Sequence, residues 1–467
     1  MRPGPAKFSR TMERLHRALI LQIMKNYAPY LSPDETGDVL RDFLWREFEL
    51  SRMCFGWLPS LEKWEHKWWS GQLGYWHARH MNVLEERIRE LPGAFDERAG
   101  SPPVLREACV RISLAPSAEA FWTGYRFILE ELYRDYDAFL AVADPVTNSP
   151  TIDCLSHVLL ERLRILEWLA KGPLAVYRDA GTPGGQDLKW LGYSSQVEAA
   201  MSKVMDGDSS AWPEIPDGDP MGPLPVDGRS DPSMAASDYR TRLSGKELES
   251  YEFYLDERNS PVANNVRQMI FINSTEIIAA ELVAYIYYSS HGLSLDFYYD
   301  TARHTWDEIR HTEMGLRRLK QLGFKIEQFR FWGPCHVPKK ATALDHYQFY
   351  SDLTNRAEAC SFSYKRACAE AFRKHGDIIS AVQSEFDIAD ERLHTGFGTK
   401  WSPELYKLAT GESMTAAALV ERFRVAALKK KGYTDEEIEG KKRILNGFCG
   451  AAEGLGKHIT TVAAAKY

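Results

Sequence analysis

The chain has 467 residues, of which 44% are apolar and 26% are charged. This composition is that of a globular protein long enough to form two or three domains. The formal net charge of −7 argues against the basic surface that nucleic-acid-binding proteins need. The sequence has no run of 18 or more apolar residues, so we expect no membrane-spanning helix.

The cysteine content indicates a reducing compartment. There are seven cysteines, an odd number, and none forms a Cys-x-x-Cys pair, which favours small buried thiols over a disulfide framework. We therefore expect a cytoplasmic location. Cys335 and His336 are adjacent, but without a second cysteine nearby we do not expect this pair to bind metal.

Residues 1–175 are expected to form an N-terminal helical domain. The segment 2–27 is basic and then apolar at helical spacing, and it lacks the small-residue cleavage site of a signal peptide. Few segments of the chain alternate apolar and polar residues with a period of two, so we expect an all-α protein without a sheet. Helical spacing of apolar residues is clear over residues 40–55, 73–91, 118–142 and 152–169.

Residues 176–240 are expected to form a linker or an extended strap. The stretch 206–240 contains six prolines, four glycines and eight acidic residues against two arginines. Such a composition buries too little apolar surface to offset the entropy lost on ordering. Trp212, Ile215 and Leu224 are the apolar side chains that would hold a strap to the surface.

Residues 241–402 are expected to form a four-helix bundle of the ferritin-like type. Two short helical hairpins are separated by a long connection over residues 323–344, and a ferritin-like bundle has one long crossover of this kind. Residues 403–467 are expected to form a C-terminal helical extension, with helices over 416–430 and 436–448. The four bundle helices are expected over residues 262–290, 294–323, 345–376 and 377–400.

One motif occurs twice inside the predicted bundle. The sequence Asp307-Glu308-Ile-Arg-His311 is followed, 83 positions later, by Asp390-Glu391-Arg-Leu-His394. A Glu-x-x-His pair in a helix places a carboxylate and an imidazole on one face, one turn apart. Two such pairs, each with a further glutamate from a neighbouring helix, form the ligand set of a di-iron or di-manganese site in a four-helix bundle.

The two further glutamates follow from helix geometry. Two half-helices and a short turn separate facing positions in a hairpin by about 30 residues, and Glu276 and Glu358 precede their motifs by 32 and 33 positions. Glu281 and Glu370 are rivals, but Glu281 lies roughly 140° around the helix from Glu276, and Glu370 is only 21 positions upstream. The expected metal ligands, which are also the expected catalytic residues, are Glu276, Glu308, His311, Glu358, Glu391 and His394.

Charged and small residues next to the motifs are candidates for supporting roles. A metal-bound histidine usually donates its other ring N–H to a carboxylate, so Asp307 and Asp390 are each expected to orient the histidine of the opposite hairpin. Arg310 is expected to balance buried negative charge. Gly315 and Gly398 lie one turn beyond the two histidines and suggest a close backbone approach, or room for O2 and substrate.

Residues 264–402 resemble the ferritin-like di-iron carboxylate superfamily. The run from Asp307 to His311 resembles the Asp-Glu-x-Arg-His run of bacterial multicomponent hydroxylases, although the second copy lacks an arginine before its histidine. The resemblance implies a di-iron oxidase or oxygenase that uses two Fe ions, with Mn as the alternative, to activate O2 and oxidise a small organic substrate. It also implies an external reductant and suggests a homodimer. The alternatives are an iron-handling ferroxidase, or a non-catalytic helical interaction protein with a structural or relic metal site.

The N-terminal helices contain a related pattern. His77-Ala-Arg-His80 resembles the first motif with histidine in place of glutamate, and Cys154-Leu-Ser-His157 resembles the second with cysteine in place of glutamate. The pattern fits either a degenerate second bundle or two unrelated helical histidine motifs. The upstream glutamates that would complete the degenerate bundle are Glu47 or Glu49, and Glu119.

Overall fold

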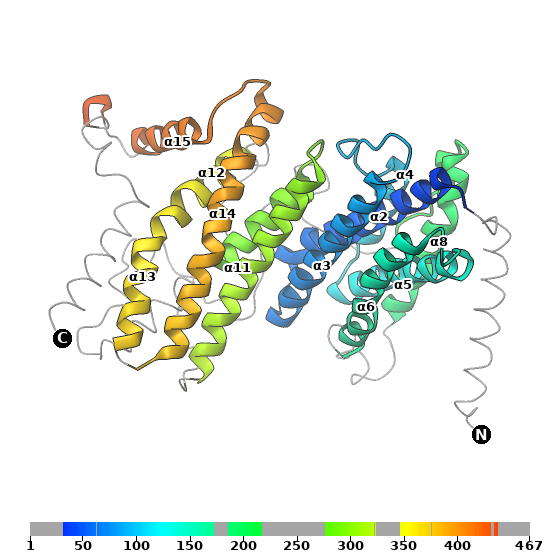
Figure 1. Ribbon diagram of the computed structural model, residues 1–467, viewed down its shortest axis with the longest axis horizontal. Coiled ribbons are helices and arrows are strands. Elements are labelled where there is room, and N and C mark those ends of the chain that lie inside the picture. Colours follow the sequence, from blue (N-terminus) through cyan, green and yellow to red (C-terminus); the bar gives the residue numbers. More distant parts are fainter. Residues whose placement is uncertain are drawn as a thin grey trace. The chain divides into compact units, whose positions relative to one another are not determined.

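The computed structural model shows helices and no strand among the residues that it describes, which makes the described chain all-α as expected (Figure 1). None of the described helices combines the length and the apolar character needed to cross a membrane. The described residues are 31–61, 63–171, 185–216, 276–321, 323, 346–374, 376–430 and 434–437.

The chain divides into two compact units. Unit 1 consists of residues 1–53 and 76–222, and unit 2 consists of residues 54–75 and 223–467. Unit 2 therefore contains the predicted bundle together with a short N-terminal segment, residues 54–75, that the sequence had placed in the first domain. The boundary falls inside two helices, so the division follows packing and does not coincide with a loop.

Unit 1 has a core rich in aromatic side chains. Phe43 packs edge-on against Tyr136, with ring centroids 4.6 Å apart, and Trp76 packs against Trp168 at 5.1 Å. Helices α2 and α3 continue into unit 2. The helices that contribute to unit 1 are α2 (Pro33–Trp57), α3 (Trp64–Arg89), α4 (Pro103–Ser113), α5 (Ala118–Val142), α6 (Ser149–Lys171) and α8 (Gly185–Met205).

Helix α8 corrects the linker prediction for part of its range, because it lies within residues 176–240. Trp190, Tyr193 and Val197 follow helical spacing and are buried, and the Trp190 indole donates to the Ile112 carbonyl at 3.1 Å. Helix α8 therefore packs against α4 and α5 as part of the unit 1 core. No helix was expected over the residues of α8, whereas α4 lies within the helical domain expected over residues 1–175.

Only the beginning of the acidic, proline-rich stretch lies within the described residues. It forms the short 3-10 helix η2 (Ser209–Ala211). The ring of Trp212 then lies 5.2 Å from the guanidinium carbon of Arg111, which holds this part of the stretch against unit 1. The remaining residues of the predicted linker, Leu224 among them, and Cys335 and His336 lie outside the described residues.

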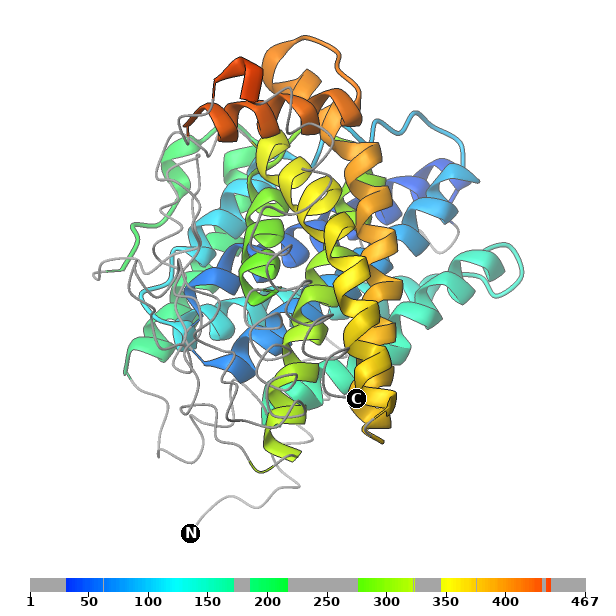
Figure 2. The ribbon, with the colours of Figure 1, turned by 90° about the vertical axis from the view of Figure 1, so that its left-hand side faces the viewer.

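Unit 2 contains the helices that carry the repeated motif. Helices α11 and α14 pack against each other, and α13 packs against α14. The axes of the three helices are roughly aligned in both views, with α13 and α14 antiparallel (Figures 1 and 2). The predicted third bundle helix is a continuous helical run formed by α12, η6 and α13. The elements are a helical segment over 276–289, α11 (Leu295–Gln321), α12 (His346–Ser351), the π-helix η6 (Asp352–Glu358), α13 (Ala359–Lys374), α14 (Ile378–Thr410) and α15 (Ala416–Lys430).

The described helices of unit 2 end close to the expected positions, with one exception. Gly292, Gly323 and Gly376 have positive φ angles of 76°, 80° and 78°, which stop helices at low steric cost. Helix α14 was expected to end near residue 400 but extends through Pro403 to Thr410. Trp401, Leu405 and Tyr406 are buried beyond the expected end, and this burial offsets the backbone hydrogen bond that proline removes.

Candidate metal centre

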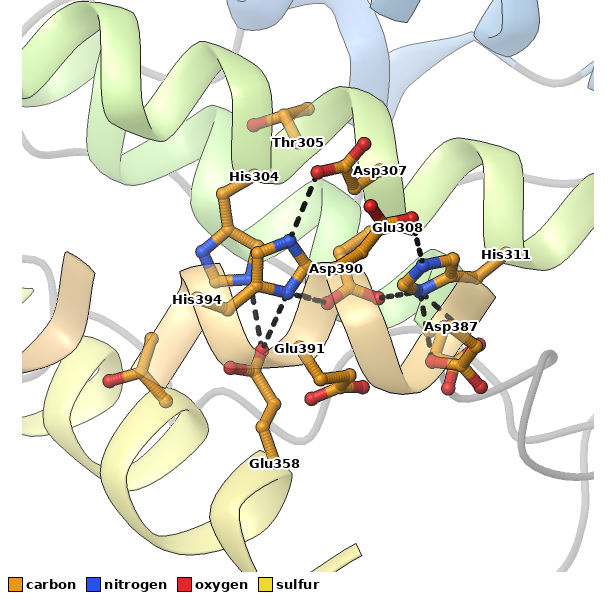
Figure 3. Close-up of polar contacts among 12 residues, drawn as sticks. His304, Thr305, Asp307, Glu308, His311, Glu358, Asp387, Asp390, Glu391 and His394 are labelled. Atoms are coloured by element: carbon orange, nitrogen blue, oxygen red, sulfur yellow. Dashed lines mark hydrogen bonds and ion pairs between the residues drawn. The ribbon is translucent and has the colours of Figure 1, made fainter. Parts of the chain in front are cut away.

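Four helical elements of unit 2 direct carboxylates and imidazoles toward a shared interior (Figure 3). The eight side chains are buried and form two groups, and within each group one ligand atom per residue lies within 4.8 Å of the others. Cluster A consists of His304, Glu308, Glu358 and His394, and cluster B consists of Glu276, His311, Asp387 and Glu391.

Cluster A contains two imidazoles and two carboxylates. The His304 Nε2 atom lies 2.9 Å from Glu358 Oε1 and 3.3 Å from Glu308 Oε1. The His394 Nδ1 atom lies 3.7 Å from Glu358 Oε1 and 3.4 Å from Glu308 Oε1. The two imidazole rings are stacked with centroids 3.8 Å apart, so both nitrogens face the same pair of carboxylates.

Cluster B contains one imidazole and three carboxylates. The His311 Nδ1 atom lies 3.5 Å from Asp387 Oδ1 and 3.9 Å from Glu276 Oε2. The Glu391 carboxylate completes the group. Lys365, on α13, reaches into this cluster and contacts the three carboxylates.

Glu308 lies between the two clusters. Its Oε1 atom faces the two histidines of cluster A, while its Oε2 atom lies 3.7 Å from the Nδ1 atom of His311 in cluster B. A carboxylate that presents one oxygen to each of two neighbouring sites can bridge two cations. The two clusters therefore form a single centre with two positions.

Several buried atoms of the centre have no hydrogen-bond partner, although buried polar atoms are paired in the large majority of cases. Leaving one unpaired costs roughly 1–3 kcal/mol. A metal ion in each cluster would use these lone pairs, so the residues fit a pair of metal ions. The six atoms are Glu308 Oε2, His311 Nδ1, Glu358 Oε2, Asp387 Oδ2, Glu391 Oε2 and His394 Nδ1.

Each histidine of the centre has its second ring nitrogen held by another side chain. His394 Nε2 lies 3.4 Å from Asp307 Oδ2, and His311 Nε2 lies 3.2 Å from Asp390 Oδ2. This is the crosswise arrangement that the sequence predicted. His304 Nδ1 lies 3.4 Å from the Tyr350 hydroxyl. Such contacts fix the tautomer and orientation of a metal-ligating imidazole.

Two arginines join the outer aspartates. Arg303 donates to Asp307 at 2.7 Å and to Asp390 at 3.3 Å, and Arg310 also bonds to both aspartates. Burial alone would raise the pKa of Asp307, but His394 and Arg303 lower it to about 2. Asp307 therefore stays ionised as an acceptor for His394. The expectation that Arg310 balances buried charge agrees with these contacts, and Arg303 is a second cation in the same role.

Without metal, the ligand groups of the centre compete for protons. Burial and the neighbouring Asp387 carboxylate raise the pKa of Glu276 to about 7. Burial alone would lower the pKa of His394, but Glu358, Asp307 and Glu308 raise it to about 10. Protons therefore occupy part of the centre when cations are absent, and metal binding releases them.

All six ligands expected from the sequence lie in the two clusters, and the two rivals lie elsewhere. Glu281 is buried but accepts a hydrogen bond from Lys67 at 2.9 Å, on a different side of its helix from Glu276. Glu370 is exposed. The helical phase therefore separates Glu276 from Glu281 as the sequence indicated.

His304, Asp387 and Lys365 also belong to the centre, although none of them was expected from the sequence. Residue 387 follows residue 304 by the same 83 positions that separate the two motifs, and each lies four residues before the glutamate of its motif. The repeat therefore extends one helical turn before the two Asp-Glu-x-x-His motifs. The signal was weak because one copy has histidine where the other has aspartate. No local pattern marks Lys365.

Gly398 is explained by a close approach between helices. A Cβ atom at this position would lie 1.8 Å from Thr354 Oγ1 and 2.4 Å from Thr354 Cβ. Thr354 belongs to η6, the π-helical turn that ends at Glu358. π-turns inside helices are often found at functional sites. Here the missing side chain lets α14 approach the turn that carries a cluster A ligand. Gly315 is buried in α11.

Unit 1 contains a third group, formed by Glu47, His77 and His80. Its nitrogen and oxygen atoms all have partners: Glu47 contacts both histidines, His77 Nε2 lies 2.5 Å from the Tyr125 hydroxyl, and His80 Nε2 lies 3.2 Å from Glu161. The Tyr136 hydroxyl also donates to Glu47. This group is a satisfied hydrogen-bond network, in contrast to clusters A and B.

The other residues of the N-terminal pattern lie outside this network. Glu49 pairs with Arg52 and Ser101. Cys154 is buried with its thiol toward the Val83 carbonyl, and His157 is exposed. Only the first half of the pattern, His77 and His80 with Glu47, therefore comes together.

Fold and site together define an all-helical protein with a buried, two-position carboxylate and histidine centre. No family model, curated protein or solved structure matches the chain.

Proposed function

We propose that the chain is a non-haem di-iron oxidase or oxygenase, with a ferritin-like bundle in unit 2, that uses O2 to oxidise a small organic substrate. The observation that carries the proposal is the set of six unpartnered, buried oxygen and nitrogen atoms that converge on clusters A and B. A structural polar network would have these atoms paired, as the network in unit 1 does.

The donor types favour iron, with manganese as the alternative. The centre offers three imidazoles and five carboxylates, and no thiolate belongs to it among the described residues. Structural zinc sites prefer four cysteine or histidine ligands, whereas oxygen-rich sites with a few imidazoles suit iron and manganese. When bound, two such ions would supply the redox chemistry and open coordination positions that O2 activation needs.

The chain contributes orientation, charge balance and exclusion of water. Glu308 ties the two positions together through its two oxygens, and Asp307 and Asp390 hold the histidines in one tautomer. The eight ligands are at most 6% exposed, so water has little access to the interior. A dry, polar interior strengthens electrostatic interactions and suppresses side reactions.

The proposal is tested by loading the purified protein with Fe(II) under anaerobic conditions and mixing it with O2 in a stopped-flow spectrometer. We expect rapid O2 consumption that a substrate from a screen of small organic compounds, with a reductant supplied, accelerates. Glu308→Gln should abolish it, whereas Glu313→Gln, on the same helix but bonded to Trp64, should not. O2 consumption that stops after the loaded iron is oxidised, whatever compound is added, would favour an iron-handling ferroxidase.

A further inference from the structure

Lys365 distinguishes the two metal positions. Its ammonium nitrogen lies 2.9 Å from Glu276 Oε1, 2.6 Å from Asp387 Oδ1 and 2.5 Å from Glu391 Oε1. Lys365 is 2% exposed, so these three carboxylates take the place of water around its charge. All three belong to cluster B.

Among the described residues, cluster A has no counterpart to this lysine. Among the residues that the structure describes, no lysine or arginine lies within ion-pair distance of Glu308 or Glu358. Among the described side chains, the two carboxylates of cluster A form ion pairs with histidines only. The clusters thus differ in two ways: cluster A has a second imidazole, and cluster B already contains a cation supplied by the chain.

We propose that Lys365 holds the place of the second metal ion and makes the two positions fill in order, cluster A first and cluster B second. This inference rests on the proposed metal function. A divalent ion in cluster B would share its carboxylates with the lysine ammonium. At separations of a few ångströms inside a protein, like charges repel strongly. The ion therefore either displaces Lys365 or binds against its charge, and both lower the affinity of cluster B.

The contacts of Lys365 with the cluster B carboxylates also stabilise the folded state of the metal-free protein. Three carboxylates buried without a counter-ion would be costly, because isolated buried charges lose their hydration. Lys365 compensates them until the metal ion arrives. The second metal ion would then neutralise the same three carboxylates that Lys365 neutralises in its absence. Among the described residues, cluster A contains no lysine or arginine, so its first ion displaces protons and has no fixed side-chain cation to compete with.

The experiment is a titration of the metal-free full chain with Mn(II), followed by electron paramagnetic resonance and by competition with a chelator of known affinity. At one molar equivalent the wild-type protein should show the six-line spectrum of isolated Mn(II), and at two equivalents the broadened spectrum of a magnetically coupled pair. The chelator should remove one ion at a concentration at least tenfold lower than the other requires.

Lys365→Gln removes the charge and keeps a polar side chain of similar reach. We expect its cluster B affinity to rise by at least tenfold, so that coupled pairs form already at one equivalent. The matched control is Lys67→Gln, which removes a fully buried lysine from Glu281, outside both clusters, and should leave both affinities unchanged. His311→Ala should retain only the tight, isolated ion.

The outcomes separate the two proposals. A wild-type protein that binds no Mn(II) or Fe(II) overturns the metal function and this inference with it. A wild-type protein that binds two ions with equal affinity overturns the ordered filling alone, even if Lys365→Gln does not fold. A weaker cluster B in Lys365→Gln would also overturn it, because the lysine would then be positioning the carboxylates for the metal.

Discussion

The imidazole of His394, on α14, lies 3.4 Å through its Nε2 atom from the Asp307 carboxylate on α11, 87 positions earlier in the chain. The same relation holds in reverse between His311 and Asp390, at 3.2 Å. Each motif thus provides the acceptor that orients the histidine of the other. These two contacts link α11 and α14 at the centre. Each cluster therefore has its own orienting carboxylate, Asp307 for cluster A and Asp390 for cluster B.

Asp307→Asn and Asp390→Asn should therefore weaken different metal positions. Loss of such an outer carboxylate typically costs roughly 10- to 100-fold in metal affinity. We expect Asp307→Asn to weaken cluster A, through His394, and Asp390→Asn to weaken cluster B, through His311. Metal titrations of the two variants, with Glu313→Gln as the control on α11, would check this. Equal losses at both positions in both variants would contradict the crosswise assignment.

The number of metal ions bound per chain should show whether both clusters bind metal. After Fe(II) loading, elemental analysis is expected to give about two ions per chain, in line with the di-metal centres of helical bundles. His394→Ala removes a cluster A ligand and His311→Ala a cluster B ligand, and each should lose about half of the iron. Full retention in both variants would rule out the ligand assignment.

Glu276 and Glu281 should behave differently although they lie five positions apart. Glu276→Ala removes a cluster B ligand and should lower metal content and O2 reactivity. Glu281→Ala should keep the metal but leave the buried ammonium of Lys67 without its carboxylate. Breaking a buried ion pair in this way costs roughly 3–5 kcal/mol, which chemical denaturation would detect. The opposite pattern would mean that the phase of this helix is wrong.

Gly398→Ala should disturb cluster A through backbone packing. The new methyl group would overlap Thr354 in η6, so this turn has to move and take Glu358 with it. We expect weaker metal binding at cluster A and a lower unfolding midpoint.

Gly396→Ala, on the same helix, is the matched control, since a Cβ atom there would meet no neighbouring group within 4 Å. It should raise stability by up to about 1 kcal/mol, the difference in helix propensity between the two residues. If the two variants bound metal equally well, the close approach at Gly398 would not matter for the centre.

The network in unit 1 predicts a pH dependence of stability. Burial alone would lower the pKa of His80, but Glu47 and Glu161 raise it from 6.5 to about 9. The folded state thus holds this proton more tightly than the unfolded state. The resulting stabilisation, about 3 kcal/mol for such a shift, is complete below pH 6.5 and is lost as the pH rises through 9.

Urea unfolding of the metal-free protein at several pH values between 6 and 10, compared with His80→Gln, measures this contribution. The wild-type chain should lose stability over that range relative to the variant. Parallel curves for the two proteins would show that His80 is not the group responsible.

The sequence by itself determined the helical class, most of the ends of the helices in unit 2 and six residues of the centre. These followed from local rules: apolar residues at helical spacing, glycines that adopt positive φ, and a Glu-x-x-His pair that must share one helical face. Because the Glu-x-x-His motif occurs twice, 83 residues apart, a centre with two metal positions could be expected. The helical phase distinguished Glu276 from Glu281. None of this required knowledge of which helices touch.

The tertiary structure decided what depends on contacts between distant helices. Only packing brought Lys365 onto the carboxylates of cluster B, paired His304 with Glu358, and placed Thr354 against Gly398. It also decided that the histidines of unit 1 form a satisfied network while those of unit 2 keep unpaired nitrogens. Residue type and spacing are alike in the two units. The difference arises because hydrogen-bond satisfaction depends on which side chains from other helices reach the same buried atoms.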